Sequence, residues 1–88
     1  MLNEIKKIQG INHNEFDSII QNLIFSAKED LKSIGIVKQK VVEEDALIKT
    51  ALITYVISFL DVPNSEMYKS SYAMQKDVLR HLSEYIEE

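Results

Sequence analysis

Apolar side chains recur along the chain at the three- and four-residue spacing of α-helices, and this rhythm predicts four helices. The first is short and covers residues 2–8. The second is long and covers residues 16–34, with Gly35 directly after it, where helices commonly end in a left-handed conformation. We expect Asn12 or Asn14 to cap its first turn, because each carries a short side-chain acceptor.

The long helix has an apolar stripe and an exposed basic face. Ile24 and Phe25 widen the stripe toward a second side, and Lys28 and Lys32 lie four residues apart on the exposed face. Phe25, Lys28 and Lys32 are candidates for an interface with another copy of the chain or with a partner. The residues expected to face the core are Phe16, Ile19, Ile20, Leu23, Ala27, Leu31 and Ile34.

The third helix, predicted over residues 46–60, is apolar around nearly its whole circumference. Its polar interruptions line up at spacing four and are Thr50, Thr54 and Ser58. A helix of this kind must be covered on nearly all sides. Two alternatives stay open: the helix is the central post of the fold, or one flank, which includes Ile53 and Ile57, meets another copy. The preceding connector, residues 36–42, is expected to be a loop with a short extended piece.

The last helix follows a clear stop and turn at residues 61–65. Ser70 or Ser71 is expected to cap it. The expected core-facing residues are Met74, Val78, Leu82, Tyr85 and Ile86, with Leu79 beside them. Three residues that flank the turn are candidates either for an interface or for local packing, namely Met67, Tyr68 and Tyr72.

Composition supports an all-α fold, a small bundle of these four helices in one domain covering residues 1–88. The chain has 88 residues, of which 45% are hydrophobic, and it contains two glycines, one proline and no cysteine. So few turn-forming residues argue against a strand-and-turn protein. A chain this short buries only about 60–65% of the surface that its unfolded form exposes, so contact with a partner would add appreciably to its stability.

The charge distribution argues against a nucleic-acid-binding protein. The net charge is −4, with six lysines against five acids in residues 1–40 and four basic residues against nine acids in residues 41–88. A protein that grips nucleic acid needs a basic stripe, because phosphate contacts supply most of the affinity. The one basic concentration, Lys28, Lys32, Lys38 and Lys40, is read as a solvated face. DNA-binding regulation is therefore the third of the functional alternatives.

Catalytic and metal-binding motifs are missing from the sequence. Asp77 and His81 are four residues apart, which suits a metal site or an ordinary ion pair, and no third ligand is evident. His13 lies in a loop, and no serine has a histidine at a readable spacing. We expect no enzyme, no cofactor and no metal. The longest apolar region, residues 47–60, is too short to cross a bilayer, so we expect a soluble intracellular protein.

The order of these pieces resembles the small head-tail connector proteins of tailed bacteriophages, also called head-completion or DNA-packaging adaptors, including prophage copies. The likeness spans nearly the whole chain and consists of apolar patterns. The passages that carry it are the short helix continuing to Ile11, the polar entry 12–17 before the long helix with Ile20, Ala27 and Leu31, the run 45–56, and Tyr68 before a last helix that ends near Tyr85 and Ile86.

The resemblance implies a structural role in virion assembly. Members form a homo-oligomeric ring under the portal protein, and the ring links the capsid to tail or stopper proteins. DNA passes through the channel without sequence-specific binding. The implied location is the head-tail junction of the virion, or the host cytoplasm before assembly, with no membrane involved. The residues themselves leave one alternative of another class, a small helical regulatory module that binds a partner protein.

Overall fold

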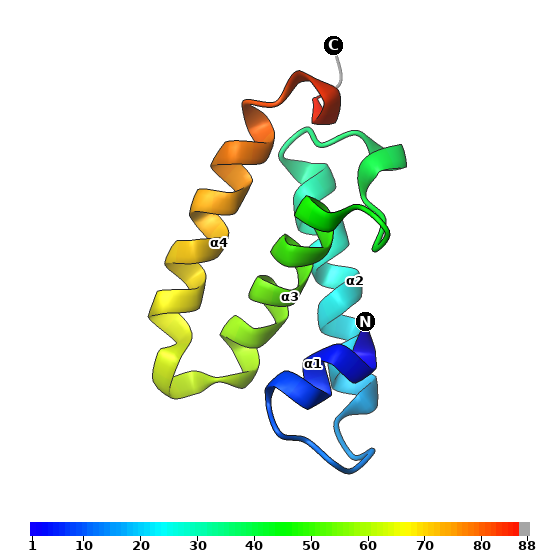
Figure 1. The fold of residues 1–88 in the computed structure, drawn as a ribbon, viewed down its shortest axis with the longest axis vertical. Coiled ribbons are helices and arrows are strands. Elements are labelled where there is room, and N and C mark those ends of the chain that lie inside the picture. Colours follow the sequence, from blue (N-terminus) through cyan, green and yellow to red (C-terminus); the bar gives the residue numbers. More distant parts are fainter. Residues whose placement is uncertain (87–88) are drawn as a thin grey trace.

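The chain folds into a bundle of four α-helices, as the sequence predicts (Figure 1). The structure is a computed structural model that describes residues 1–86. Within that range the α-helices are α1 (Leu2–Ile8), α2 (Asp17–Ser33), α3 (Ala46–Leu60) and α4 (Ser65–Arg80). Three short 3₁₀ turns lie between or after them, at Lys38–Lys40, Val62–Asn64 and Ser83–Tyr85.

The helices begin and end for local reasons that the sequence reveals only in part. Gly10 follows α1 with φ 68° and Gly35 follows α2 with φ 98°, a conformation that favours glycine. The prediction that Asn12 or Asn14 caps α2 is wrong, because the cap is Phe16 and no side chain bonds the first turn. The Asn14 side chain instead accepts a hydrogen bond from Lys6 Nζ at 2.9 Å.

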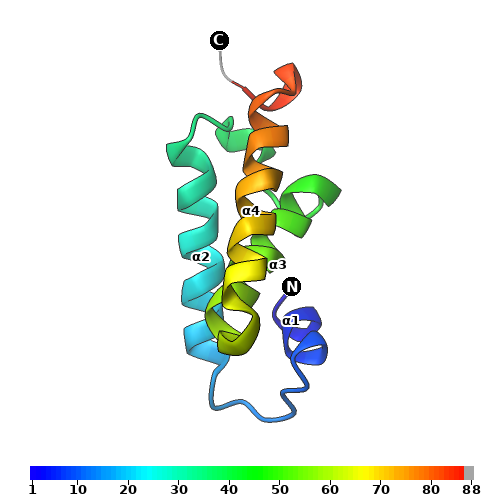
Figure 2. The same cartoon turned by 90° about the vertical axis from the view of Figure 1, so that its left-hand side faces the viewer.

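Helix α3 is the central post of the fold, which is the first of the two alternatives posed by its sequence. Seven of its residues are buried, and they lie all around the middle of the helix: Ile48, Ala51, Leu52, Thr54, Val56, Ile57 and Ser58. Helix α2 lies on one face of the pair formed by α3 and α4, and α1 covers the end of α3 near residue 60 (Figures 1 and 2). The chain's own helices therefore cover most of α3. Of the large apolar side chains of α3, only Leu47 and Phe59 are exposed.

The core has two parts arranged along α3. One part joins the first half of α3 to α2, to α4 and to the segments around Ile36 and Tyr85. The other joins the second half of α3 to α1 and to the first half of α2, around Ile5 and Ile20. Every helix thus contributes to the core, α1 with Ile5 alone and α2 with a stripe in which Ala27 and Leu31 are fully buried.

Helix α4 differs from its prediction in both its length and its inner face. It begins at Ser65 rather than after Ser70 or Ser71, and it ends at Arg80. Met74 and Val78, expected in the core, are 71% and 54% exposed. The buried residues of α4 are Tyr72 and Leu79. They share a face because residues seven apart on a helix lie almost in line.

The end of the chain turns back onto the connector between α2 and α3. Ile36 and Ile86 form an isolated antiparallel bridge, and the Val37 backbone N–H donates to the Tyr85 carbonyl at 2.8 Å. The expected short extended piece in the connector is thereby confirmed. Leu82, Tyr85 and Ile86 do reach the core, but they come from this return segment and not from α4.

Two residues predicted to face the core along α2 are exposed. Phe16 is 43% exposed and Ile19 is 53% exposed, while Ile24, expected to widen the apolar stripe, is buried. The buried stripe of α2 is Ile20, Ile24, Ala27 and Leu31. No single helix within residues 1–86 is long and apolar enough to span a membrane; only α3 together with the segment Val62–Arg80, bent by 114° at their junction, has the length and composition.

Candidate interaction surfaces

The outward surface of α2 carries three of the residues predicted to form an interface. Phe25 is 62% exposed, and Lys28 and Lys32 follow it at spacings that place all three on one side of the helix. Lys28 Nζ lies 3.3 Å from Glu43 Oε2, which ties α2 to the loop before α3, and Lys32 Nζ lies 3.8 Å from Glu29 Oε1. The side chains of Lys28 and Lys32 are 30% and 34% exposed, so Phe25 is the most exposed of the three residues.

The other predicted interface residues are divided between the interior and the surface. Ile57 and Tyr72 are 3% and 7% exposed, so neither side chain is available to a neighbouring molecule. Ile53 is half-buried against the core part around α1, and Tyr68 is half-buried on the inner side of α4. Met67 is 57% exposed. Phe25 and Met67 are therefore the exposed members of the predicted set, and Lys28, Lys32, Ile53 and Tyr68 are partly exposed.

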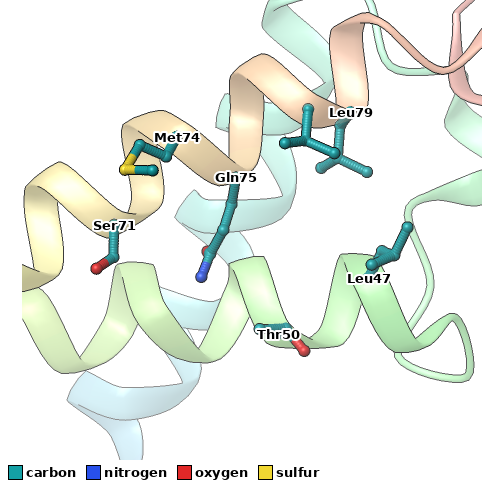
Figure 3. A pocket seen from close by; sticks show the side chains of 7 residues that line it. Leu47, Thr50, Ser71, Met74, Gln75 and Leu79 are labelled. Carbon is teal, nitrogen blue, oxygen red and sulfur yellow. The ribbon is translucent and has the colours of Figure 1, made fainter.

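A cleft of about 400 Å³ runs between α3 and α4 on the side facing away from α2 (Figure 3). Its exposed apolar residues are Leu47, Met74 and Val78, at 46%, 71% and 54% exposure. The complete lining consists of Leu47, Thr50, Ser71, Met74, Gln75, Val78 and Leu79. Met67 lies on the same side of α4, since residues 67, 71, 74 and 78 repeat at spacings of three and four.

Helical geometry explains why α4 turns these apolar residues outward. Met74 is two residues from the buried Tyr72, which places it about 200° further round the helix. Tyr72 faces α2, where its hydroxyl donates to Asp30 Oδ2 at 2.6 Å. Because the Tyr72 face is held against α2, the Met74 face must point toward the open side of the α3–α4 pair.

One polar contact between α3 and α4 lies beneath the cleft, within a mainly apolar interface. The Gln75 amide donates to Thr54 Oγ1 at 3.1 Å, and Thr54 Oγ1 donates to the Thr50 carbonyl at 2.8 Å. Ser58, which is 5% exposed, bonds the Tyr55 carbonyl at 2.6 Å. The polar strip of α3 is therefore largely inside the protein, and its hydroxyls are satisfied by the helix backbone.

A network around Asp30 fixes α4 to α2. Besides the Tyr72 hydroxyl, Asp30 Oδ2 contacts Lys76 Nζ at 3.4 Å, and the Lys76 ammonium lies 4.7 Å from the centre of the Tyr72 ring. Burial, and then the hydrogen bond to Asp30, raise the pKa of Tyr72 above its ordinary value. Tyr72 also meets Tyr55 of α3 edge to face at 5.2 Å. Asp30 thus links α2 to α4, and the Tyr72 ring links α4 to α3.

A second carboxylate, Asp45, links the start of α3 to the end of the chain. Its side chain accepts the backbone N–H groups of Leu47 and Ile48 at 3.0 and 3.2 Å, and both of its oxygens lie 2.9 Å from the Tyr85 hydroxyl. Desolvation raises the pKa of Asp45, but these bonds outweigh it and leave the pKa below its ordinary value. Burial, and then the bond to Asp45, raise the pKa of Tyr85 to about 12.

The described residues do not assemble the groups that would hold a metal ion. Within residues 1–86 no cluster of three His, Cys, Asp or Glu side chains is placed for one. His81 Nδ1 lies 2.7 Å from the Asp77 carbonyl and 3.8 Å from Asp77 Oδ1, the arrangement of a local helix-end contact. His13 Nδ1 accepts the backbone N–H of Glu15 at 3.3 Å.

Comparison with known proteins identifies the family of this chain. The family described as phage connector protein matches residues 1–85, nearly the whole length. The chain belongs to this family. The connector is matched by no curated protein and by no solved structure. Its family membership establishes a structural connector role in a phage and implies association with phage head or tail components, in the virion or the cytoplasm.

The cleft is the surface that the sequence reasoning missed. The pattern that could have found it is Met67, Ser71, Met74 and Val78, an apolar stripe on α4. A second stripe, Tyr68, Tyr72, Gln75 and Leu79, competes with it at the same spacing. The presence of Asp30 opposite Tyr72 decides between the two, and that pairing across 42 residues is visible only in the fold.

Proposed function

We propose that the connector forms a ring of identical subunits that joins the capsid portal to the tail or its stopper proteins and lets DNA pass through its centre. The observation that carries the proposal is the family match over residues 1–85. The ring would sit at the head-tail junction of a virion, from an active phage or a prophage. The subunit acts there as a structural part of the DNA-packaging machinery and catalyses no reaction.

Exposed apolar surface on separate faces supports assembly with neighbours. Phe25 projects from α2, and the α3–α4 cleft opens on the other side of the bundle. A ring needs two different surfaces on each subunit, because a head-to-tail interface joins unlike patches. One apolar patch that pairs with itself gives a dimer, whereas two different patches on each subunit allow a closed ring.

The charge of the connector supports passive passage of DNA. Its net charge is −4, and none of its helices carries a basic stripe that could hold the phosphate backbone. An acidic channel repels DNA and so lets it slide without being held. We therefore expect no salt-dependent shift of duplex DNA at physiological ionic strength.

The test is assembly of the purified connector, alone at high concentration and mixed with the portal protein of the same phage or prophage. Electron microscopy should show closed rings, or a ring stacked beneath the portal. A connector that sediments as a monomer and also fails to join the portal would contradict the proposal. That result would favour the alternative, a small regulatory module that binds one partner protein.

A further inference from the structure

We infer that residues 81–86 form a strap with two conformations. In one, which the structure shows, the strap is folded back on the loop between α2 and α3. In the other, the strap is lifted and continues α4 as a longer helix, by about one and a half turns beyond Arg80. This change takes place within one subunit and is independent of the proposed ring.

Helix α4 ends without a local stop signal, unlike the three helices before it. Gly10 and Gly35 follow α1 and α2 with positive φ, and Pro63 comes shortly after α3. The strap, in contrast, contains neither glycine nor proline. Its apolar positions, 82, 85 and 86, continue the three- and four-residue spacing of α4. The local sequence therefore permits a helix that runs past Arg80, and only contacts with distant residues turn the chain back.

The backbone of a single residue separates the two conformations. His81 is still in the helical region, at φ −94° and ψ −4°, and Ser83–Tyr85 form a 3₁₀ turn. Leu82 between them is extended, at φ −98° and ψ 112°. Rotation of this one ψ to the helical value of about −42°, with a slight widening of the 3₁₀ turn, would join α4 and the turn into one helix.

The polar contacts that hold the strap down converge on Tyr85. Its hydroxyl lies 2.9 Å from both carboxylate oxygens of Asp45, and its carbonyl accepts the Val37 N–H at 2.8 Å. Lys40 Nζ lies 5.7 Å from the centre of its ring. The Tyr85 side chain is also 5% exposed and packs in the core part that joins α2, α3 and α4. Because these contacts share one residue, they are made and lost together.

The site on which the strap docks would stay formed when the strap lifts. The Asp45 carboxylate is held by the backbone N–H groups of Leu47 and Ile48, which belong to α3. The core part around Ile5 contains no strap residue, and Figure 1 shows the strap at the end of the bundle away from α1. Lifting would therefore free the Val37 N–H and the Asp45 oxygens while most of the bundle keeps its packing.

Hydrogen exchange of the unmodified chain, followed by NMR for each amide, tests whether the strap lifts. The Val37 N–H is bonded to the strap, whereas Leu52 lies in the middle of α3 and is fully buried. We expect the protection of Val37 to be at least about 100-fold lower than that of Leu52, because lifting exposes Val37 without global unfolding. Equal protection of the two amides would overturn the inference, since the strap would then open only with the whole subunit.

Two substitutions of the exposed Ser83 test whether the lifted strap is helical. Proline disfavours a helix interior by a factor of about 100, but it suits the first position of a turn that follows an extended residue. Ser83→Pro should therefore raise the protection of Val37 by about tenfold or more, whereas the matched control Ser83→Ala should leave it unchanged or lower it. A rise at Val37 no larger than the rise at Leu52 would overturn the helical form, because a proline that only restricts the unfolded chain acts on both amides.

Carbon chemical shifts show the lifted strap directly. Tyr85→Ala removes the contacts that converge on this residue and introduces a strong helix former, so residues 81–86 should acquire helical Cα shifts. The same variant combined with Ser83→Pro should lose those shifts. Random-coil shifts in a folded Tyr85→Ala protein would overturn the inference. If Tyr85→Ala does not fold, the exchange of Val37 in the unmodified chain and in the two Ser83 variants still decides the outcome.

Discussion

The Asp45 carboxylate should contribute strongly to stability, because two structural elements depend on it. It caps α3 through two backbone N–H groups and accepts the hydroxyl of Tyr85, which is 5% exposed. Replacing a capping Asp by Ala costs about 1 kcal/mol, and leaving a buried hydroxyl without a partner costs about 1–3 kcal/mol. We therefore expect Asp45→Ala to lower the free energy of unfolding by about 2–4 kcal/mol, a large part of the stability of a small domain.

Urea denaturation followed by circular dichroism measures this loss, and a double-mutant cycle separates its parts. Tyr85→Phe removes the same hydrogen bond and should cost about 1.5 kcal/mol, the lower end for bonds to charged groups. The double variant should then be less destabilised than the sum of the single variants by about 1–2 kcal/mol. Glu44→Ala, the exposed neighbour of Asp45, is the control and should change stability by less than about 0.5 kcal/mol. Strict additivity, or a cost for Asp45→Ala no larger than that of Glu44→Ala, would refute the reasoning.

Three further predictions concern the core, the surface of α2 and the pH dependence of stability. Val56→Glu places a carboxylate at a fully buried site of α3 and should abolish the cooperative thermal transition, whereas Val78→Asp, at an exposed site, should keep it; a folded Val56→Glu protein would contradict the assigned core. Lys28→Glu faces Glu43 and should lower the free energy of unfolding by no more than about 1 kcal/mol in urea titration, so a larger loss would mean that this pair is essential to the fold. The raised pKa values of Tyr85, to about 12, and of Tyr72 mean that the unfolded chain loses these protons first, near pH 10. Stability should therefore be intact below pH 10 and fall as the pH rises from 10 toward 12, and Tyr85→Phe should make that fall shallower; an unchanged slope would rule out Tyr85 as a source.

The helices themselves were predictable because their signals are local. The predicted ranges of α1 and α3, residues 2–8 and 46–60, are confirmed. Gly10 follows α1 with a positive φ, and Asp45 caps α3 directly before its apolar run. The central place of α3 was one of two predicted alternatives, and the three other helices cover most of it. The connector's short extended piece also followed from its β-branched residues.

The inner face of α4 could not be predicted because it depends on contacts between distant residues. The spacing of Met74, Val78, Leu82 and Tyr85 suggested one continuous stripe, but the helix ends at Arg80 and the chain turns back. Leu82 and Tyr85 therefore reach the core from the segment that follows α4 and not from α4 itself. Tyr72 then faces inward because Asp30 accepts its hydroxyl, and Met74 and Val78 are left on the surface.

The same contacts explain why the candidate surfaces were only partly predictable. Phe25, Lys28 and Lys32 were identified from a helical pattern alone, and they lie on one accessible side of α2. Ile57 and Tyr72 also matched an interface pattern, but they are buried in the subunit. Burial of these two could be known only from the packing of α2 and α4 around α3.

Native mass spectrometry of the connector, alone and released from portal complexes, tests the central claim most directly. A ring of identical subunits predicts one dominant species whose mass is a fixed integer multiple of the subunit mass, unchanged as the concentration rises. A monomer at every concentration, or an open series of oligomers with no preferred number, would contradict the account.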